Sequence, residues 1–257
     1  MKAIIPAAGH GTRFLPVTKV VPKEMLPIGS KPALELIVDE AKSAGADEIV
    51  LVISHGKELI REYFKDDPAI RFVYQEEQRG LGHAILQASS LFSGSSSRLL
   101  ILLGDCLVAG CNAAKAMAEV SAANGGASVI GLERVLPEKV SRYGIVKPSS
   151  CAIEQSTNPN NLNNRTIRIA DLVEKPSPEE APSDLAIAGR YLLRTEIFDY
   201  LRTQTPGKGG EIQLTDAIRR MVREGGAELR PYIYPGKRHD IGNPQGYYET
   251  LKVFMEG

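Results

Sequence analysis

The residues with the clearest chemical potential lie near the start of the chain, where an apolar stretch runs into small residues. Residues 7–28 read AAGHGTRFLPVTKVVPKEMLPI. Small side chains leave the backbone open to close approach by a flat base or a phosphate, and glycine-flanked amides can form a concave anion cradle. The residues expected to do this are Ala7, Ala8, Gly9, Gly11 and Thr12. The opening stretch therefore predicts a binding site for a phosphorylated ligand.

Positive charge follows these small residues. Arg13 offers a planar fork to two phosphate oxygens, and Lys19 and Lys23 offer point charges on a proline-stiffened stretch. The loop is not a Walker A motif, because no Gly-Lys-Ser/Thr follows, and Phe14 stands where the dinucleotide fingerprint needs its third glycine. The cations favour a triphosphate whose charge grows during displacement at phosphorus. A plain basic surface turn is the alternative, and it stays open above all for Lys19.

Two aspartates follow strand-like stretches. Asp105 ends RLLILLGD, and Asp240 lies in RHDIGNP, where Gly242 allows a turn back into a cleft. A carboxylate is costly to bury unless it is paired or binds a cation, and Mg²⁺ takes one or two carboxylates with phosphate oxygens and water. The alternatives are a capping role for Asp105 and a buried hydrogen-bonded pair of His239 with Asp240. Zinc is excluded because the four histidines show no ligand spacing.

Further candidates lie in the middle of the chain. Glu174 and Lys175 end a strand-like stretch, and their side chains face opposite sides unless Pro176 bends the strand end. Without such a bend, Glu-Lys-Pro is a surface turn. Gly144 is expected within a strand, where glycine admits close backbone approach. Gln75 offers a donor and an acceptor together, which is enough to read the edge of a pyrimidine.

The elements that must position these residues follow an α/β pattern. Apolar runs without alternation indicate parallel strands covered on both faces, and helical periodicity separates them. The expected strands of the first half are 2–6, 48–54, 70–75 and 98–104, with helices at 32–45, 55–65, 81–92 and 113–124. The second half adds strands at 127–135, 143–148, 166–176, 184–193 and 227–235, with helices at 195–203 and 213–224. This predicts a Rossmann-like, mostly parallel sheet flanked by helices, with a small β subregion.

The absence of an internal repeat or a flexible linker predicts one domain over residues 1–257. We expect a nucleotide-binding half at 1–131 and a second half at 132–257, with the asparagine-rich segment 158–165 as a solvated hairpin tip. Lys and Arg total 31, as do Asp and Glu, so no overall positive field invites nucleic acid or an anionic membrane. Three cysteines without a disulfide framework, and no apolar run of about 18 residues, favour a cytoplasmic protein.

The opening segment, written GxGTRxLPxTKxxPKEMLPI, resembles the signature of bacterial UTP–glucose-1-phosphate uridylyltransferases, a branch of the sugar-1-phosphate nucleotidyltransferases. The resemblance continues in order through GLGHA (80–84), VEKP (173–176), LAIAGRYLL (185–193), GEIQLTDAI (210–218) and HDIGNPQGY (239–247). It therefore spans nearly the whole chain.

This resemblance implies transfer of a uridylyl group from UTP to glucose 1-phosphate with release of pyrophosphate, assisted by Mg²⁺. The implied catalytic residues are Arg13, Lys23, Asp105 and Lys175, and the implied metal ligands are Asp105 and Asp240. The nucleotide would contact Ala7, Ala8, Gly9, Gly11, Thr12, Arg13, Lys23, Gln75, Gly80 and Asp105. The sugar phosphate would contact Gly144, Glu174, Lys175 and Ile187. The nucleophile is a phosphate oxygen that is already ionised, so no general base is required.

Three departures from the family pattern bear on this expectation. The segment between the helix at 55–65 and the strand at 70–75 is short, and the fourth strand ends in LLGD, as in thymidylyltransferases, where uridylyltransferases commonly have LPD. The chain also lacks the longer tail that often helps to build the oligomer, so a homo-oligomer stays an open expectation. Glu24 favours uridylyl transfer, because thymidylyltransferases usually have glutamine there.

Other functions remain as alternatives. A thymidylyltransferase or another sugar-1-phosphate nucleotidyltransferase would share most of these motifs. A non-catalytic regulatory protein on the same fold would be expected to lose the charged residues that this chain retains. An NAD-dependent oxidoreductase would need an acidic residue about 20 positions past the glycines at a strand end, and that interval falls instead in the helix expected at 32–44.

Overall fold

The computed structural model describes residues 1–92, 98–149 and 168–255. Its main sheet contains nine strands, and seven of them run in the order β10-β9-β11-β6-β1-β4-β5, while β8 pairs with β11 and β12. The parallel half consists of β1 (Lys2–Pro6), β4 (Glu48–Ile53), β5 (Ile70–Tyr74) and β6 (Arg98–Leu102). The other strands are β8 (Ser128–Arg134), β9 (Gly144–Pro148), β10 (Ile169–Glu174), β11 (Leu185–Arg194) and β12 (Leu229–Ile233).

The two halves of the sheet differ in strand direction. β1 pairs in parallel with β4 and β6, whereas β11 pairs antiparallel with β6, β8 and β9. The register of β11 against β8 shifts between Ile187 and Tyr191, around Gly189 with its positive φ of 80°. The expected mixed, mostly parallel α/β sheet with a small β subregion is therefore confirmed.

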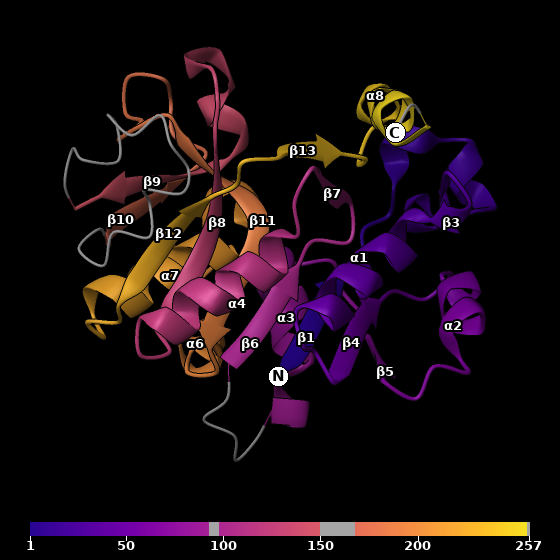
Figure 1. Ribbon diagram of the computed structural model, residues 1–257, viewed down its shortest axis with the longest axis horizontal. Coiled ribbons are helices and arrows are strands. Elements are labelled where there is room, and N and C mark those ends of the chain that lie inside the picture. Colours follow the sequence, from indigo (N-terminus) through magenta and orange to yellow (C-terminus); the bar gives the residue numbers. More distant parts are fainter. Residues whose placement is uncertain (93–97, 150–167, 256–257) are drawn as a thin grey trace.

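Helices cover both faces of this sheet (Figure 1). They are α1 (Ala33–Ser43), α2 (Glu58–Phe64), α3 (Leu81–Gln87), α4 (Ala113–Ala123), α6 (Ile197–Arg202) and α7 (Leu214–Arg223). A further helix, α8 (Pro244–Met255), packs mainly against the strand Lys237–Asp240 outside this sheet. In Figure 1, α1 and α4 lie in front of the sheet, and α3 lies behind it with α6. None of the helices in the described ranges is long and apolar enough to cross a membrane.

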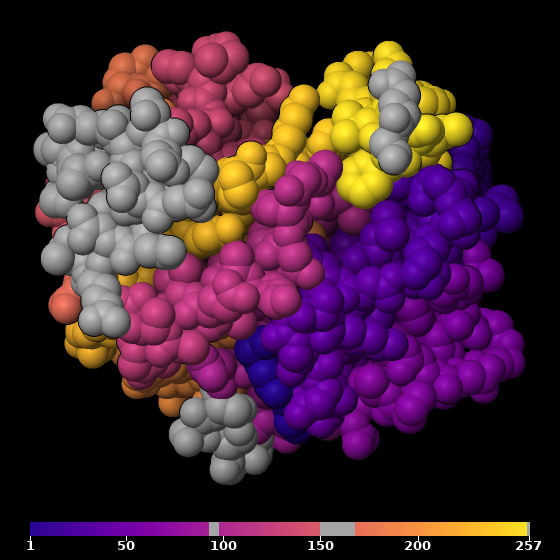
Figure 2. Space-filling model, in the orientation of Figure 1, coloured from indigo at the N-terminus to yellow at the C-terminus, as the bar shows by residue number. Residues whose placement is uncertain are grey.

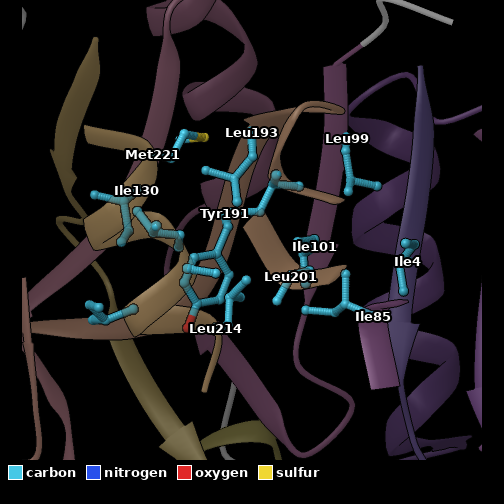
Figure 3. Packing of buried hydrophobic residues seen from close by; sticks show 14 of the residues in the cluster. Ile4, Ile85, Leu99, Ile101, Ile130, Tyr191, Leu193, Leu201, Leu214 and Met221 are labelled. Atoms are coloured by element: carbon cyan, nitrogen blue, oxygen red, sulfur yellow. The ribbon is translucent and has the colours of Figure 1, made fainter. Parts of the chain in front are cut away.

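Two hydrophobic cores explain why the strands show little alternation. Along β1, Ile4 packs into the core beneath α3, α6 and α7, while Ala3 and Ile5 pack into the core beneath α1 and α2. Figure 3 shows the first of these cores, in which Ile4 lies near Ile85 of α3. Because both strand faces are buried, apolar residues occupy successive positions.

The expected strands match the observed ones closely, and the helix ends follow familiar signals. Ala44 caps α1, and Gly45 follows it with a φ of 88°, in the left-handed region that glycine adopts at helix ends. The helix expected at 81–92 is interrupted, because α3 ends at Gln87 and a short 3₁₀ helix covers Ser89–Phe92. Gly144 begins β9 instead of lying inside it. The asparagine-rich segment 158–165 lies outside the described residues.

A small ribbon and the C-terminal helix are absent from the sequence-based expectation. β7 (Cys106–Ala109) pairs antiparallel with β13 (Lys237–Asp240), and α8 follows. Tyr247 of α8 donates a hydrogen bond to the carbonyl of Pro27 over 2.9 Å, and its ring meets that of Phe14 edge-on. Figures 1 and 2 show the resulting contact between the yellow C-terminal helix and the indigo N-terminal region. The C-terminal helix thus packs beside the opening loop, far from the N-terminus (Figure 1).

Candidate functional site

The carboxyl ends of the parallel strands meet at one sheet edge, which is where ligands bind in open α/β sheets. Ala7 follows β1 there, and its N–H donates to the carbonyl of Val52 at the end of β4, over 2.7 Å. Gly104 follows β6, and its N–H donates to the carbonyl of Pro6. A side-chain carbon at Gly104 would lie only 2.6 Å from that carbonyl oxygen. The glycine of LLGD therefore lets the chain press against β1 and places Asp105 beside the opening loop.

Lys23 and Asp105 form the central ion pair of this edge. Lys23 lies in the 3₁₀ helix η3 (Lys23–Met25), and its Nζ donates to Asp105 Oδ2 over 2.6 Å. Burial by itself would raise the pKa of Asp105, but the charge and hydrogen bond of Lys23 hold it below its ordinary value. Burial likewise opposes the charge of Lys23, but the carboxylates of Asp105, Glu24 and Asp240 together outweigh it and raise the Lys23 pKa. Both groups are therefore ionised at neutral pH.

Asp240 reaches the same place from the other end of the chain. It pairs with Cys106 in the ribbon, and the next residue, Ile241, donates its N–H to the carbonyl of Asp105 over 2.9 Å. Gly242 N donates to Asp240 Oδ1 over 2.8 Å. A side-chain carbon at Gly242 would lie 2.9 Å from Asp240 Oδ1 and 3.0 Å from Asp105 Oδ2. The two carboxylates therefore flank one point.

Two aspartates at one point fit a divalent cation with a preference for oxygen. Mg²⁺ binds through one or two carboxylates and keeps positions for water and phosphate oxygens. The described ranges contain no group of three or more histidine, cysteine or acidic side chains able to hold a metal.

His239 packs edge-on against the ring of Phe254, with 6.0 Å between centroids, and no hydrogen bond joins it to Asp240 among the described contacts. The alternative of a hydrogen-bonded His239–Asp240 pair is thus not found.

In the opening loop (residues 7–28), Gly11 lies close to the side chains of Thr18 and Lys23. Gly11 adopts a φ of 65°, and a side-chain carbon there would lie 2.9 Å from Thr18 Cγ2 and 3.7 Å from Lys23 Cγ. Ala7 and Ala8 are buried in the floor, whereas Gly9, Thr12 and Arg13 are exposed. Arg13 makes no ion pair with any other residue that the structure describes. The expected cradle residues therefore combine a buried floor at Ala7 and Ala8 with exposed residues at Gly9, Thr12 and Arg13.

Gln75 and Gly80 lie together at the next part of this edge. Gln75 follows β5, is 4% exposed, and places its side-chain Nε2 3.4 Å from the Gly80 carbonyl oxygen and 3.0 Å from His83 Nδ1. Gly80 precedes α3 with a φ of 101°. A side-chain carbon at Gly80 would lie 2.8 Å from Glu211 Cβ. The close approach of the loop that contains Glu211 therefore requires glycine at position 80.

The residues expected around the sugar meet at the start of β9. A side-chain carbon at Gly144 would lie 2.8 Å from Ile187 Cδ1, 2.8 Å from Thr215 Oγ1 and 3.1 Å from Glu174 Oε2. Three of these four residues come from the sequence-based expectation, and they lie together. Thr215 is an addition, because its sequence context indicates only a helix start. Its hydroxyl becomes recognisable as part of this group once α7 is seen to pack against β10.

Lys175 adopts an unusual backbone conformation beside this group. Its φ is 46°, the only positive φ of a non-glycine residue in the described chain. Its N–H donates to the carbonyl of Tyr143 over 2.9 Å, and its own carbonyl accepts a hydrogen bond from Lys208 Nζ. Its Nζ lies 3.4 Å from Glu174 Oε1. The bend expected at Pro176 is present and keeps Glu174 and Lys175 on the same side.

A buried ion pair supports the opening loop, and sequence reasoning missed its lysine. Lys57 Nζ donates to both carboxylate oxygens of Glu24 over 2.9 Å and to the carbonyl of Ala7 over 2.5 Å. Glu24 is 1% exposed and Lys57 is 6% exposed. Burial raises the pKa of Glu24 and lowers that of Lys57. A lysine just after β4 carries no motif, so only its buried contacts reveal it.

A cavity of about 950 Å³ adjoins the site. It lies between the segment from Glu133 to Tyr143, the ribbon strand β13 and helix α8, and Figure 2 shows a notch at the top of the molecule between these regions. Asp240 lies in its wall, whereas Asp105 and Lys175 do not. The cavity therefore borders the carboxylate pair without containing the other candidate residues.

Comparison with protein families identifies the class. The profile described as Nucleotidyl transferase matches residues 2–256. The chain therefore belongs to the nucleotidyl transferase family.

Individual relatives narrow this class. UTP–glucose-1-phosphate uridylyltransferase 2 of Staphylococcus saprophyticus is 40% identical over an alignment 274 residues long, which covers 97% of this chain and 90% of the relative. The UTP–glucose-1-phosphate uridylyltransferase YngB of Bacillus subtilis is 38% identical, over 97% of this chain and 87% of the relative. A crystal structure of UDP-glucose pyrophosphorylase complexed with UDP-glucose superimposes with a TM-score of 0.86 at 34% identity, covering 99% and 98%. The structure of a UTP-bound UGPase from Acinetobacter baumannii superimposes with a TM-score of 0.81 at 32% sequence identity, over 100% of this chain and 94% of that chain. The resemblance to uridylyltransferases is confirmed.

Proposed function

We propose that the protein transfers a uridylyl group from UTP to glucose 1-phosphate, giving UDP-glucose and pyrophosphate. One observation carries the proposal: Lys23, Asp105 and Asp240 converge at the sheet edge beside a glycine-rich loop. The nearly full-length similarity to uridylyltransferases supports this choice of substrates.

The reaction is an in-line displacement at the α-phosphorus of UTP. A phosphate oxygen of glucose 1-phosphate forms the new bond, and the bond from the α-phosphorus to the bridging oxygen of the β-phosphate breaks. The electron pair leaves with pyrophosphate. Because the attacking oxygen is already ionised, the chain supplies positioning and charge neutralisation instead of a general base.

Three cationic residues carry the charge neutralisation in this proposal, and one carboxylate positions one of them. Arg13 and Lys23 hold the phosphates of UTP, Lys175 holds the phosphate of the sugar, and Asp105 fixes Lys23 through their ion pair. Asp105 and Asp240 are also the residues that would hold Mg²⁺. The bound cation would neutralise phosphate charge and align the phosphate oxygens.

The remaining candidates shape the two substrate pockets. The uridine and its phosphates would contact Ala7, Ala8, Gly9, Gly11, Thr12, Gln75 and Gly80. The sugar would contact Gly144, Glu174 and Ile187, to which the structure leads us to add Thr215. In this proposal the nucleotide-binding half is residues 1–131 and the sugar-phosphate-binding half is residues 132–257, within one domain. A protein that consumes UTP works where nucleoside triphosphates are kept, so we place it in the cytoplasm.

The direct test is a substrate matrix. Purified protein is incubated with Mg²⁺ and each of UTP, dTTP, CTP and GTP against glucose 1-phosphate and its epimers, and pyrophosphate release is measured. We expect the highest kcat/KM for UTP with glucose 1-phosphate. Preferential use of dTTP would make the protein a thymidylyltransferase, and no release with any pair would contradict nucleotidyl transfer.

A further inference from the structure

The side-chain amide of Gln75 is held on one side by two groups. Its Nε2 lies 3.0 Å from His83 Nδ1 and 3.4 Å from the carbonyl oxygen of Gly80. A carbonyl oxygen only accepts hydrogen bonds, so it requires an N–H of Gln75 to face it. The Gly80 carbonyl therefore favours the orientation in which the NH₂ group of Gln75 points into the protein.

His83 has amide groups at both ring nitrogens. The side-chain Nε2 of Gln87 lies 3.1 Å from His83 Nε2, on the opposite side of the ring from Gln75. A neutral imidazole accepts at one nitrogen and donates at the other, so the two amides cannot both donate to it. Gln87 Nε2 also donates to the carbonyl of His83 over 3.3 Å, but Gln87 is only half-buried, so water can replace that contact when its amide turns over. Gln75 is 4% exposed, and no water can replace its contact to Gly80. The arrangement that keeps the buried amide of Gln75 paired has a bare Nδ1 and the proton on Nε2.

This arrangement leaves one group of Gln75 for a ligand. Both N–H bonds of its amide are directed to protein acceptors. Gln75 Oε1 accepts no hydrogen bond from the residues that the structure describes, and it is not among the buried polar atoms without a partner. Oε1 therefore retains some exposure, and it can accept a hydrogen bond from a ligand.

We infer that His83 sets the base selectivity of the site by holding the Gln75 amide with its oxygen toward the nucleotide. This inference rests on the proposed function, since it assumes that a base binds beside Gln75 and Gly80. The N3–H of uracil or thymine can donate to Oε1, whereas N3 of cytosine is itself an acceptor and meets a second acceptor. His83 is thus a positioning residue that never touches the base.

The surroundings of His83 keep its ring neutral. Burial lowers the pKa of His83 below its ordinary value of 6.5, and the positive charge of Arg79 lowers it further. The backbone and carboxylate of Glu77 act in the opposite direction without reversing the shift. At neutral pH the ring therefore offers an acceptor to Gln75, as the inferred arrangement needs.

The test compares UTP with CTP in matched variants. We expect His83→Leu, which removes the acceptor, to lower the ratio of kcat/KM for UTP over CTP by about tenfold or more, the effect of one hydrogen bond that selects between the bases. In His83→Asn, Oδ1 occupies the place of Nδ1, and the ratio should stay within about threefold of the wild-type value. Gln87→Ala, which removes the other contact of the ring, should leave the ratio unchanged.

An unchanged ratio in His83→Leu would overturn the inference, and so would an equal fall in Gln87→Ala. Circular dichroism checks that each variant is folded. If His83→Leu does not fold, the ratio of kcat/KM for UTP over CTP in His83→Asn still tests the inference. If the wild-type protein released no pyrophosphate from UTP, the proposed function would fail. The affinity ratio for UTP and CTP, measured by calorimetry on the same variants, would then still decide the role of His83.

Discussion

At the scale of single residues, Lys175 combines a functional charge with an unfavourable backbone. A left-handed conformation costs a residue with a side chain roughly 1–2 kcal/mol. The hydrogen bonds from its N–H to Tyr143 and from Lys208 to its carbonyl hold it in this conformation. Strained residues gather at functional sites, and the strain here keeps the Lys175 side chain beside Glu174.

We expect Lys175→Ala to raise the KM for glucose 1-phosphate by about tenfold or more, because a charge-assisted contact to its phosphate is lost. UTP affinity, measured by calorimetry, should stay within about twofold. Lys175→Gly separates charge from strain, since it should lose sugar-phosphate binding equally but unfold at higher temperature than Lys175→Ala. Equal loss of UTP and sugar-phosphate binding would place Lys175 elsewhere.

The lowered pKa of His83 predicts a pH dependence. The ring stays neutral at and above pH 6.5, and as the pH falls through its lowered pKa it becomes protonated at Nδ1. Gln75 must then turn its oxygen toward the ring and lose its contact to the base. The KM for UTP should therefore be flat above pH 6.5 and rise below it. His83→Asn carries no titrating group there, so any rise it retains comes from the substrates, and an identical profile would contradict the prediction.

At the scale of secondary-structure elements, the Glu24–Lys57 pair ties the opening loop to the start of α2. Removing one partner of a buried ion pair typically costs about 3–5 kcal/mol, whereas replacing both partners is often neutral. We expect Glu24→Gln to lower the free energy of unfolding by roughly that amount in urea titrations. The double variant Glu24→Leu with Lys57→Met, which replaces both charges by apolar side chains, should recover part of it, because only the Ala7 carbonyl then lacks its donor. A single variant as stable as the wild type would show that the pair does not stabilise the loop.

The elements that sequence reasoning found and missed differ in how they are stabilised. β1, β4 and β6 are buried on both faces, so their apolar runs identify them. β13 reads Lys-Arg-His-Asp and has no apolar pattern, because its pairing with β7 and the contact of Arg238 with Glu133 hold it in place. Helix α8 has only Thr250 fully buried, so it lacks a strong apolar stripe.

The same distinction applies to the site. Motif residues such as Lys23, Asp105 and Asp240 were predicted because their types and positions carry the chemistry, and the structure brings these three together. Lys57 and Thr215 depend on contacts across long sequence separations, which a single sequence does not display. Their roles emerged only from the folded arrangement.

At the scale of the whole molecule, one sheet edge would serve both substrates of the proposed reaction. The segment from Gly207 to Gln213 links the two sides: Ile212 exchanges hydrogen bonds with the backbone of Arg79 and Gly82, both over 2.8 Å, while Lys208 bonds to Lys175. The base-reading segment and the sugar-phosphate lysine are thereby held by a single loop. Such fixed placement is how nucleotidyl transfer without a general base gains its rate.

The most direct test of this account is Mg²⁺-dependent pyrophosphate release from UTP and glucose 1-phosphate by Asp105→Ala. The exposed Asp47, which pairs with the N-terminus, provides the matched control Asp47→Ala. We predict that Asp105→Ala loses about 10²–10³ in kcat, the scale of a lost electrostatic contact at the reacting centre, while Asp47→Ala keeps wild-type turnover. Near-normal, Mg²⁺-dependent turnover by a folded Asp105→Ala would contradict the account.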